Sequence, residues 1–227
     1  MLGLVFITVT HQSIPRRGYR SELRARQAEE TRTRILVSAS ELFAADGYAR
    51  TTLAKIAAAS GVSAETVQGQ GSKAALLIAA LEYTVVGVSG EENVLNLELG
   101  HKLLAAASPP EAIELIVAEQ TQAHQRSAGL GLALIGAANG DPELDCYLTG
   151  LLASVTEQHR RILEIYRDRG WLRDQMPFEE LVETSAVFCS IETFIRITQR
   201  DGWSLDRYRN WLRLVMAEVV FLPPQGN

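Results

Sequence analysis

The stretch between positions 31 and 77 constrains the fold of this chain more than any other part of the sequence. Its first part carries an apolar residue followed by others one, four, seven and eight positions later. This is the spacing of one face of a helix, which we expect from about residue 28 to residue 46. These residues are Ile35, Leu36, Ala39, Leu42 and Phe43. Gly47 follows and suits the left-handed backbone position that ends such a helix.

Hydroxyl side chains then divide the rest of the stretch into short helices. Thr52 can cap a helix over residues 53–59, and Ser63 can cap another over 64–68. Ser60-Gly61 makes the turn between them. This spacing is that of a helix-turn-helix, in which the first helix braces the second so that its first residues enter the DNA major groove. Short pairs of helices also occur in proteins that do not bind DNA.

Charge is distributed unevenly along the chain. The net charge is −5, yet residues 1–75 hold ten Lys and Arg against six Asp and Glu, while the remainder holds 12 against 21. A basic end on an acidic body fits a protein that meets DNA with its N-terminal part, with ordinary surface variation as the alternative. Residues 16–26 carry five arginines and one glutamate, which indicates either an arm that touches DNA or a solvated tail.

The rest of the sequence continues in helical patterns without useful strand alternation. Ser72 can cap a helix from Lys73 toward Val86. We expect the later helices over about 109–126, a short irregular one within 129–140, a long one from 141 to about 170, and two more over 178–199 and 204–221. The sequence therefore predicts an all-α fold of about nine helices.

Several classes of function lack their usual signatures. Cys146 and Cys189 form no CxxC pair, so we interpret them as free thiols in a reducing cytoplasm. The four histidines have no ligand spacing, and no catalytic motif or nucleotide loop is present, so we expect no metal and no cofactor. The apolar run over residues 1–10 is too short to span a bilayer and is interpreted as a loose N-terminal arm, with a signal peptide as the alternative.

The order of residues across this stretch resembles the N-terminal domain of TetR-family transcriptional regulators. The resemblance covers about 47 residues. It is carried by Leu42-Phe43, Gly47-Tyr48, Thr51-Thr52, Ile56-Ala57, Gly61-Val62-Ser63, Thr66-Val67, Ser72-Lys73 and Leu76-Leu77. It implies a flexible basic arm over 1–27, a DNA-binding domain over 28–75, and a helical ligand-binding and dimerisation domain over 76–222.

One departure from the family pattern lies after the recognition helix. The family usually has a tyrosine, a histidine and a phenylalanine there, whereas this chain has Gln68-Gly69-Gln70-Gly71, one residue shorter and without an aromatic ring. Two glycines disfavour a continued helix, by about 1 kcal/mol each relative to alanine. We therefore expect a short recognition helix, with Gln68 or Gln70 taking the place of the tyrosine or reading adenine.

The resemblance also places residues toward DNA. Ala64 and Glu65 lie where family members meet base edges, and Glu65 either accepts from cytosine or is a first-turn acid favoured by the helix dipole. The remaining candidates either contact phosphate or serve as caps and solvated side chains. These candidates are Arg50, Thr52, Lys55, Ser63, Thr66 and Lys73.

The body of the chain carries weaker predictions, all of them implied by the resemblance. An effector pocket of about 300–1,000 Å³ is expected among the middle helices, for a small and largely apolar ligand. Its candidate lining residues, each of which is otherwise a core or surface residue, are His124, Tyr147, Phe188, Cys189 and Glu192. The helices over 178–199 and 204–221 are expected to pair across a two-fold axis.

Together these features predict a ligand-responsive homodimeric repressor that binds a palindromic operator in double-stranded DNA. Two alternatives remain open at this point. One is a small-molecule sensor or partner-binding protein with a degenerate DNA-binding head, which the 68–71 segment motivates. The other is an all-α enzyme whose site carries no recognised motif.

Overall fold

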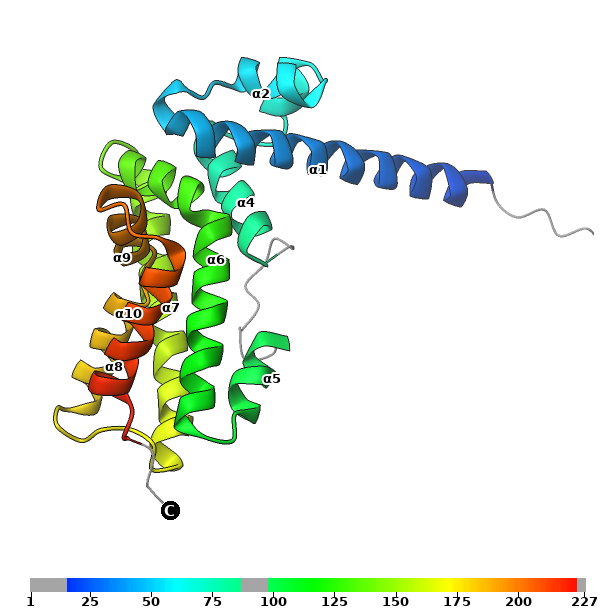
Figure 1. Cartoon of the computed structure of the whole chain (residues 1–227). Coiled ribbons are helices and arrows are strands. Elements are labelled where there is room, and N and C mark those ends of the chain that lie inside the picture. The colour runs from blue at the N-terminus through cyan, green and yellow to red at the C-terminus, as the bar shows by residue number, and fades with distance from the viewer. Residues whose placement is uncertain (1–15, 87–97, 224–227) are drawn as a thin grey trace, which may run out of the picture.

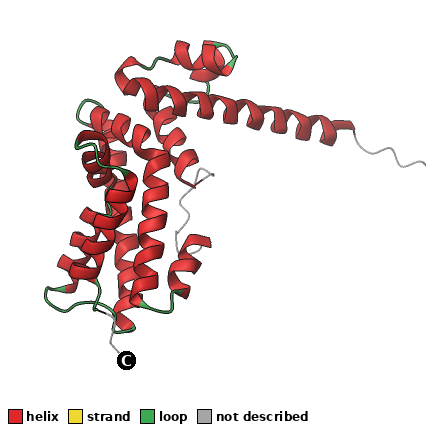
Figure 2. Cartoon of the chain, viewed as in Figure 1, coloured by secondary structure: helices red, strands yellow, loops and turns green. Residues whose placement is uncertain are grey.

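The computed structural model describes residues 16–86 and 98–223, and within these ranges the predicted all-α class is confirmed (Figures 1 and 2). Apart from an isolated bridge between Leu172 and Phe221, the regular elements there are helices. They are α1 (Arg16–Arg50), α2 (Leu53–Ser60), α3 (Ala64–Gln68), α4 (Lys73–Val86), α5 (Glu98–Ala105), α6 (Pro109–Ala138), α7 (Pro142–Asp168), α8 (Phe178–Phe188), α9 (Ile191–Ile195) and α10 (Leu205–Val215). Two π-helical segments, η2 (Arg196–Arg200) and η3 (Met216–Val220), continue α9 and α10.

The molecule has a head and a body that share one long helix. In Figure 1, α1 crosses one end of the body, α2 and α3 lie on its outer side, and its first half projects away from the rest. Below it, α6 and α7 run along the body, with α8, α9 and α10 packed against them. We call α1–α4 the head and α5–η3 the body.

The first helix begins earlier than predicted. We expected it from about residue 28, with residues 1–27 as a flexible arm, but α1 is already helical at Arg16. The reason is composition, because between Arg16 and Ala28 only Gly18 disfavours a helix strongly, whereas Arg, Leu, Glu, Gln and Ala favour one. The flexible arm remains a prediction only for residues 1–15, which lie outside the described residues.

Local end signals are confirmed along the chain. Gly47 has the predicted positive φ of 76°, which interrupts α1 before its last residues. The side chains of Thr52, Ser63 and Ser204 each accept a hydrogen bond from the backbone N–H three residues later, and Ser72 and Asp141 cap α4 and α7 in the same manner. These ends were predictable because each depends on residues within one turn of the helix.

The prediction of a separate irregular helix over 129–140 is wrong, since α6 runs unbroken from Pro109 to Ala138. Its glycines serve close packing. A Cβ built on Gly129 would lie 2.7 Å from the Cβ of Ala44 in α1, and one on Gly131 would lie 2.6 Å from Cδ1 of Ile191 in α9. Tertiary contacts across these two positions therefore outweigh the low helix propensity of glycine.

The single helix expected over 178–199 is also interrupted. α8 ends at Phe188, and α9 restarts at Ile191 with the Ser190 side chain accepting from the N–H of Thr193. Because neither proline nor glycine marks this break, the periodicity of the apolar residues gave no sign of it.

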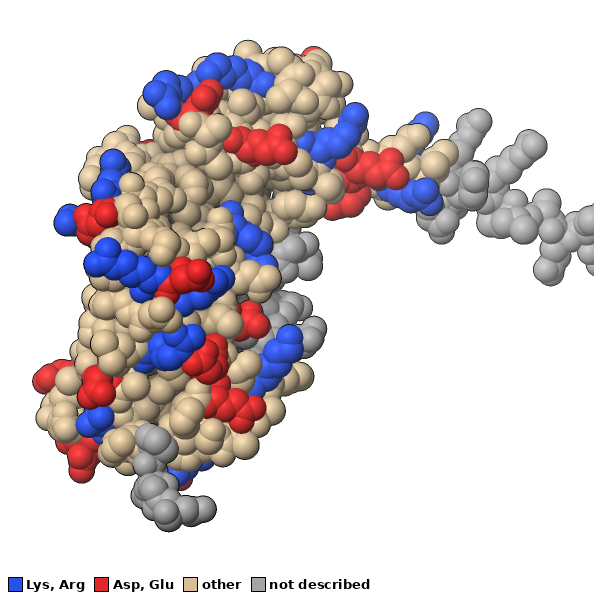
Figure 3. Space-filling view, viewed as in Figure 1, with Lys and Arg blue, Asp and Glu red and all other residues tan. Residues whose placement is uncertain are grey.

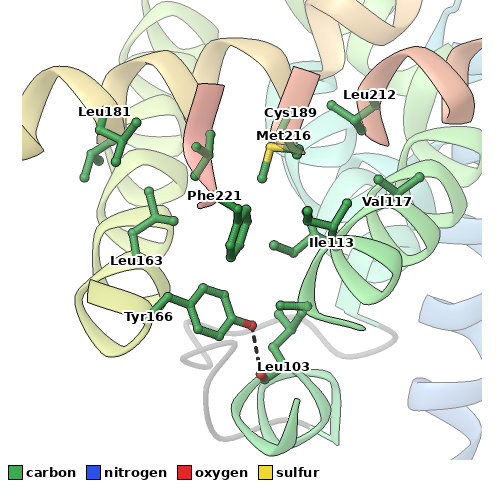
Figure 4. Packing of buried hydrophobic residues seen from close by; sticks show 14 of the residues in the cluster. Leu103, Ile113, Val117, Leu163, Tyr166, Leu181, Cys189, Leu212, Met216 and Phe221 are labelled. Atoms are coloured by element: carbon green, nitrogen blue, oxygen red, sulfur yellow. Dashed lines mark hydrogen bonds between the residues drawn. The ribbon is translucent and has the colours of Figure 1, made fainter. Parts of the chain in front are cut away.

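Two hydrophobic clusters hold the structure together, and α6 contributes to both. The cluster under the head joins residues of α1–α4, such as Phe43, Ile56 and Val67, to Leu130 and Leu134 of α6. The cluster in the body joins the first half of α6 to the later helices, as Figure 4 shows around Tyr166 and Phe221. The head is therefore not a separate folding unit, because part of its core comes from a body helix.

Candidate nucleic-acid interface and ligand site

The geometry of α2 and α3 positions a short exposed helix on the outside of the head. Thr52 Oγ1 accepts from the Lys55 N–H at 3.2 Å, and Gly61 turns the chain with φ 67°. Val67 is fully buried and anchors α3 from beneath. The opposite face of α3 and its cap is exposed, and it carries Ser63, Ala64, Glu65, Thr66 and Gln68.

The loop after α3 contains the residues that depart from the family pattern. Gly71 has φ 136°, which an L-residue with a side chain rarely adopts, and a Cβ there would lie 3.1 Å from that of Ala75. The short loop thus depends on this glycine. Arg32 of α1 donates to Gln70 Oε1 at 3.4 Å, so Gln70 is held against α1 while Gln68 stays exposed.

Lys73 lies at the seam between head and body and is not a free surface cation. Its Nζ donates to the backbone oxygen of Tyr48 at 3.1 Å and sits 4.0 Å from the centre of the Tyr48 ring. Tyr48 in turn donates its hydroxyl proton to Asp141 Oδ2 at 2.8 Å, which lowers the pKa of that carboxyl group. Sequence reasoning placed Lys73 at the right helix end but missed Tyr48 as its partner, because the two are 25 positions apart.

The other two predicted cations remain exposed on the head. Lys55 Nζ pairs with Asp46 Oδ2 at 2.9 Å, and this partner lowers the pKa of Asp46. Arg50 donates from Nε to the Asp46 backbone oxygen at 2.9 Å. Figure 3 shows basic side chains gathered over the end of α1 and α2, with acidic ones beside them. The head surface thus offers positive charge next to the exposed face of α3.

The comparisons with known proteins agree with this geometry. The profile described as "Bacterial regulatory proteins, tetR family" matches residues 35–80, which contain the capped helices of the head. Residues 35–80 are therefore similar to the N-terminal domain of TetR-family regulators. A search of curated protein sequences found no match.

Several solved structures share the fold over most of the chain. A transcriptional regulator from Saccharomonospora viridis, in complex with choline, is 21% identical with a TM-score of 0.66, over 86% of this chain and 100% of its own. NalD, the secondary repressor of the MexAB-OprM multidrug efflux pump in Pseudomonas aeruginosa, is 20% identical with a TM-score of 0.65, over 88% and 100%. The SmeT–triclosan complex is 18% identical with a TM-score of 0.66, over 86% and 93%.

The structure brings together most of the side chains predicted to line an effector pocket. His124 of α6 lies with Nε2 at 2.8 Å from the Cys189 backbone oxygen, and Glu192 is close enough for its charge to act on the imidazole. Phe188 packs edge-on against Trp211, with ring centres 6.4 Å apart. Tyr147 does not join them, because it packs against the cluster under the head.

Two further side chains belong to this region and were missed from the sequence. His159 of α7 lies near His124, and burial lowers the pKa of both rings. Tyr208 of α10 is fully buried, with its ring 5.1 Å from that of Phe194. No sequence signal separated them from ordinary core residues, because both fall on the apolar face of an amphipathic helix.

The described residues contain neither a cluster suited to a metal ion nor a helix suited to spanning a membrane. No group of three or more His, Cys, Asp or Glu side chains in residues 16–86 and 98–223 is arranged to hold a metal ion. Within those same ranges, no helix combines the length and apolar character needed to cross a membrane. A surface hollow of about 880 Å³ lies along the projecting part of α1, where polar side chains from Arg26 to Arg34 line it.

Proposed function

We propose that this protein is a ligand-responsive homodimeric transcriptional repressor that binds a palindromic operator. The observation that carries the proposal is the exposed face of α3, which Ser63 caps and Val67 anchors on the hydrophobic core. A recognition helix needs this arrangement, since its first residues must reach base edges while its other face stays fixed. The similarity of residues 35–80 to TetR-family regulators supports the same conclusion.

The dimer part of the proposal rests on exposed apolar side chains in the last helices. Val187 on α8 is 60% exposed and Leu214 on α10 is 61% exposed, and Trp211 next to Leu214 is only half-buried. α8 packs beside η3, the continuation of α10, so the two helices can form one face. A second copy of this face would cover these residues and complete a four-helix interface.

The ligand part of the proposal rests on the ligands of similar structures and on the hydrogen bonds between the head and the start of α7. One similar structure holds choline, another holds triclosan, and NalD is described as a repressor. In this chain, the first turn of α7 is bonded to the head by Tyr48 to Asp141 and by Ser72 Oγ to Glu143 Oε2 at 3.2 Å. A ligand that moves α7 would therefore move the head. To release DNA, that ligand must bind the DNA-incompetent state more tightly than the DNA-bound one.

Fluorescence anisotropy with the DNA upstream of the protein's own coding sequence tests the proposal. We expect tight binding to a duplex containing an inverted repeat, weak binding to a scrambled duplex, and a steep loss of affinity between 50 and 200 mM salt. Weak binding that ignores sequence would instead favour a sensor or partner-binding protein with a degenerate head.

Two variants separate base reading from phosphate contact. Gln68→Ala should change base preference, because Gln68 is exposed at the end of α3. Arg50→Ala should weaken binding to all duplexes alike, because Arg50 is an exposed cation at the end of α1 and a candidate for phosphate contact. Equal scaling of all affinities by both variants would remove Gln68 from base readout. Chemical conversion of a bound ligand would instead favour the alternative that the protein is an all-α enzyme.

A further inference from the structure

Three buried side-chain polar atoms among the described residues of the body have no hydrogen-bond partner. Among the described residues, the buried side-chain nitrogen and oxygen atoms without a partner are Arg173 Nε, Glu192 Oε2 and Tyr208 OH. The arginine has other partners, because its Nη2 donates to the Ala217 backbone oxygen at 3.2 Å and lies 3.8 Å from Glu218 Oε2. Buried polar groups are usually paired, so the unpaired carboxylate and phenol need a physical explanation.

Glu192 and Tyr208 belong to one connected group of side chains. The carboxylate of Glu192 acts on the ring of His124. That ring lies 5.5 Å from Phe194, and Phe194 lies 5.1 Å from Tyr208, with ring centres as reference points. Trp211 extends the aromatic group, since its ring is 5.9 Å from Tyr208. The group therefore places a carboxylate at one side of an aromatic cluster formed by α9 and α10.

The two histidines of this region are neutral, and each donates to a backbone oxygen. A carbonyl oxygen can only accept, so His124 donates from Nε2 to Cys189 and His159 donates from Nδ1 to Val155 at 2.9 Å. Burial lowers the pKa of both rings, which keeps them neutral at pH 7. The second nitrogen of each ring is then an acceptor. The region thus combines an unpaired carboxylate and an unpaired phenol with two neutral imidazoles and no cationic side chain among these members.

We propose that the effector of this protein is an organic cation with N–H donors on an apolar group, whose ammonium binds Glu192. Its apolar part would pack on the rings of Phe194, Tyr208 and Trp211, where a cation also gains from the aromatic faces. The inference deepens the proposed function, because it gives the chemical class of the ligand expected there. An anionic ligand is disfavoured, because it would bring a second negative charge beside an unpaired carboxylate.

Calorimetric titration with three probes of one chain length tests this assignment. Octylammonium, 1-octanol and octanoate share an apolar tail and differ in the charge of the head group. We expect octylammonium to bind at least tenfold more tightly than octanol, with octanoate weakest. In Glu192→Gln the preference for octylammonium over octanol should fall below threefold. Glu29→Gln, which removes the same charge from the exposed part of α1, should leave the preference unchanged.

The other outcomes overturn the assignment. Equal affinity for octylammonium and octanol, tighter binding of octanoate, or no binding of any probe would each show that Glu192 and Tyr208 are satisfied by something other than a cation, such as buried water. Melting temperatures of the variants establish that they fold. Operator binding by the ligand-free protein is measured in parallel, so a regulator with a different effector class is distinguished from a protein that does not bind DNA.

Discussion

The head and the body differ in their buried polar groups, since among the described residues the buried side-chain atoms without a partner all lie in the body. In the head, Thr51 is fully buried and its hydroxyl reaches the backbone oxygens of Leu42 and Gly47 at 3.2 and 2.8 Å. Ser60 is likewise buried and donates to the Ile56 oxygen at 2.7 Å. In the body, Glu192 Oε2 and Tyr208 OH are buried without partners.

This difference indicates which region is complete as a single chain. Fully bonded polar groups fix the head in one arrangement, as the precise placement of α3 on DNA requires. The body keeps unsatisfied polar atoms inside and exposed apolar side chains outside, at Val187 and Leu214. Under the proposed function, an effector would bond the unsatisfied atoms and a second subunit would cover the exposed apolar side chains.

The largest expected effect concerns how well the body shields its buried side chains from solvent. Burial raises the pKa of Cys189 to about 12, whereas Cys146 is exposed. A raised pKa keeps the thiol neutral, so at pH 8 its thiolate population falls about 1,000-fold below that of an ordinary cysteine. We expect iodoacetamide to modify Cys146 at least 1,000-fold faster than Cys189, as measured by mass spectrometry.

The variant Cys146→Ser leaves Cys189 as a reporter of body opening. Modification of Cys189 should be faster in urea than in the native protein. It should be slower with an effector bound in the body than without one. If Cys146 and Cys189 of the wild-type protein were modified at rates within tenfold of each other, the body would open freely. The body would then differ from the head in mobility and not in its buried polar groups.

The next effect concerns the outer face of the body. Leu214→Arg should convert the dimer to a monomer in sedimentation velocity and weaken operator binding by about 100-fold, because the two half-sites would no longer be bound as a linked pair. Leu152→Arg, at a leucine of α7 that is 44% exposed, serves as the control and should do neither. A Leu214→Arg protein that remains dimeric would remove α10 from the interface.

A smaller effect is expected at the joint between the two regions. Gly129→Ala should destabilise the protein by about 1–3 kcal/mol, since the new Cβ meets Ala44 of α1 at 2.7 Å. Gly131→Ala should cost less, because it meets only the flexible end of Ile191. Gly136→Ala is the matched control in the same helix, where nothing lies within 4 Å, and should stabilise by up to about 1 kcal/mol. Chemical denaturation measures all three, and an equal response would show that α1 and α6 are not in tight contact.

The smallest effect tests the bond that links Tyr48 to the body. Tyr48→Phe should lower the melting temperature by about 2 °C at pH 7. Because the folded-state pKa of Asp141 is lowered, its contribution is present above about pH 4 and is lost as the pH falls through the folded value. The difference between wild type and variant should therefore shrink in acid. A difference that is constant down to pH 3 would assign the effect to packing of the ring with Phe43.

The accuracy of sequence reasoning followed the range of the interactions involved. The caps at Thr52, Ser63 and Ser72 were predicted because the donor and acceptor lie three residues apart. The continuity of α6 was missed because Gly129 is explained only by Ala44, which lies 85 positions earlier in the chain. The break after Phe188 was missed because Ser190 looks like any other helical serine until its backbone turns.

The same rule applies to the candidate sites. The exposed face of α3 could be read from Ser63 and Val67, which belong to one local motif. The partners of Gln70 and Lys73, which are Arg32 and Tyr48, come from another helix and needed the fold. For the ligand site, Glu192 was a candidate by residue type alone, and only its unpaired oxygen distinguishes it from an ordinary surface acid.

The passage of α6 through both hydrophobic clusters limits how such a protein can be recombined. A chimera that exchanges only α1–α4 would lose the contacts of Leu130 and Leu134 with the head, and those of Leu144 at the start of α7. A working exchange of DNA specificity would have to carry these positions along with the head. Regulators built on this plan should therefore diversify by substitutions on the exposed face of α3, since that surface can change without repacking either cluster.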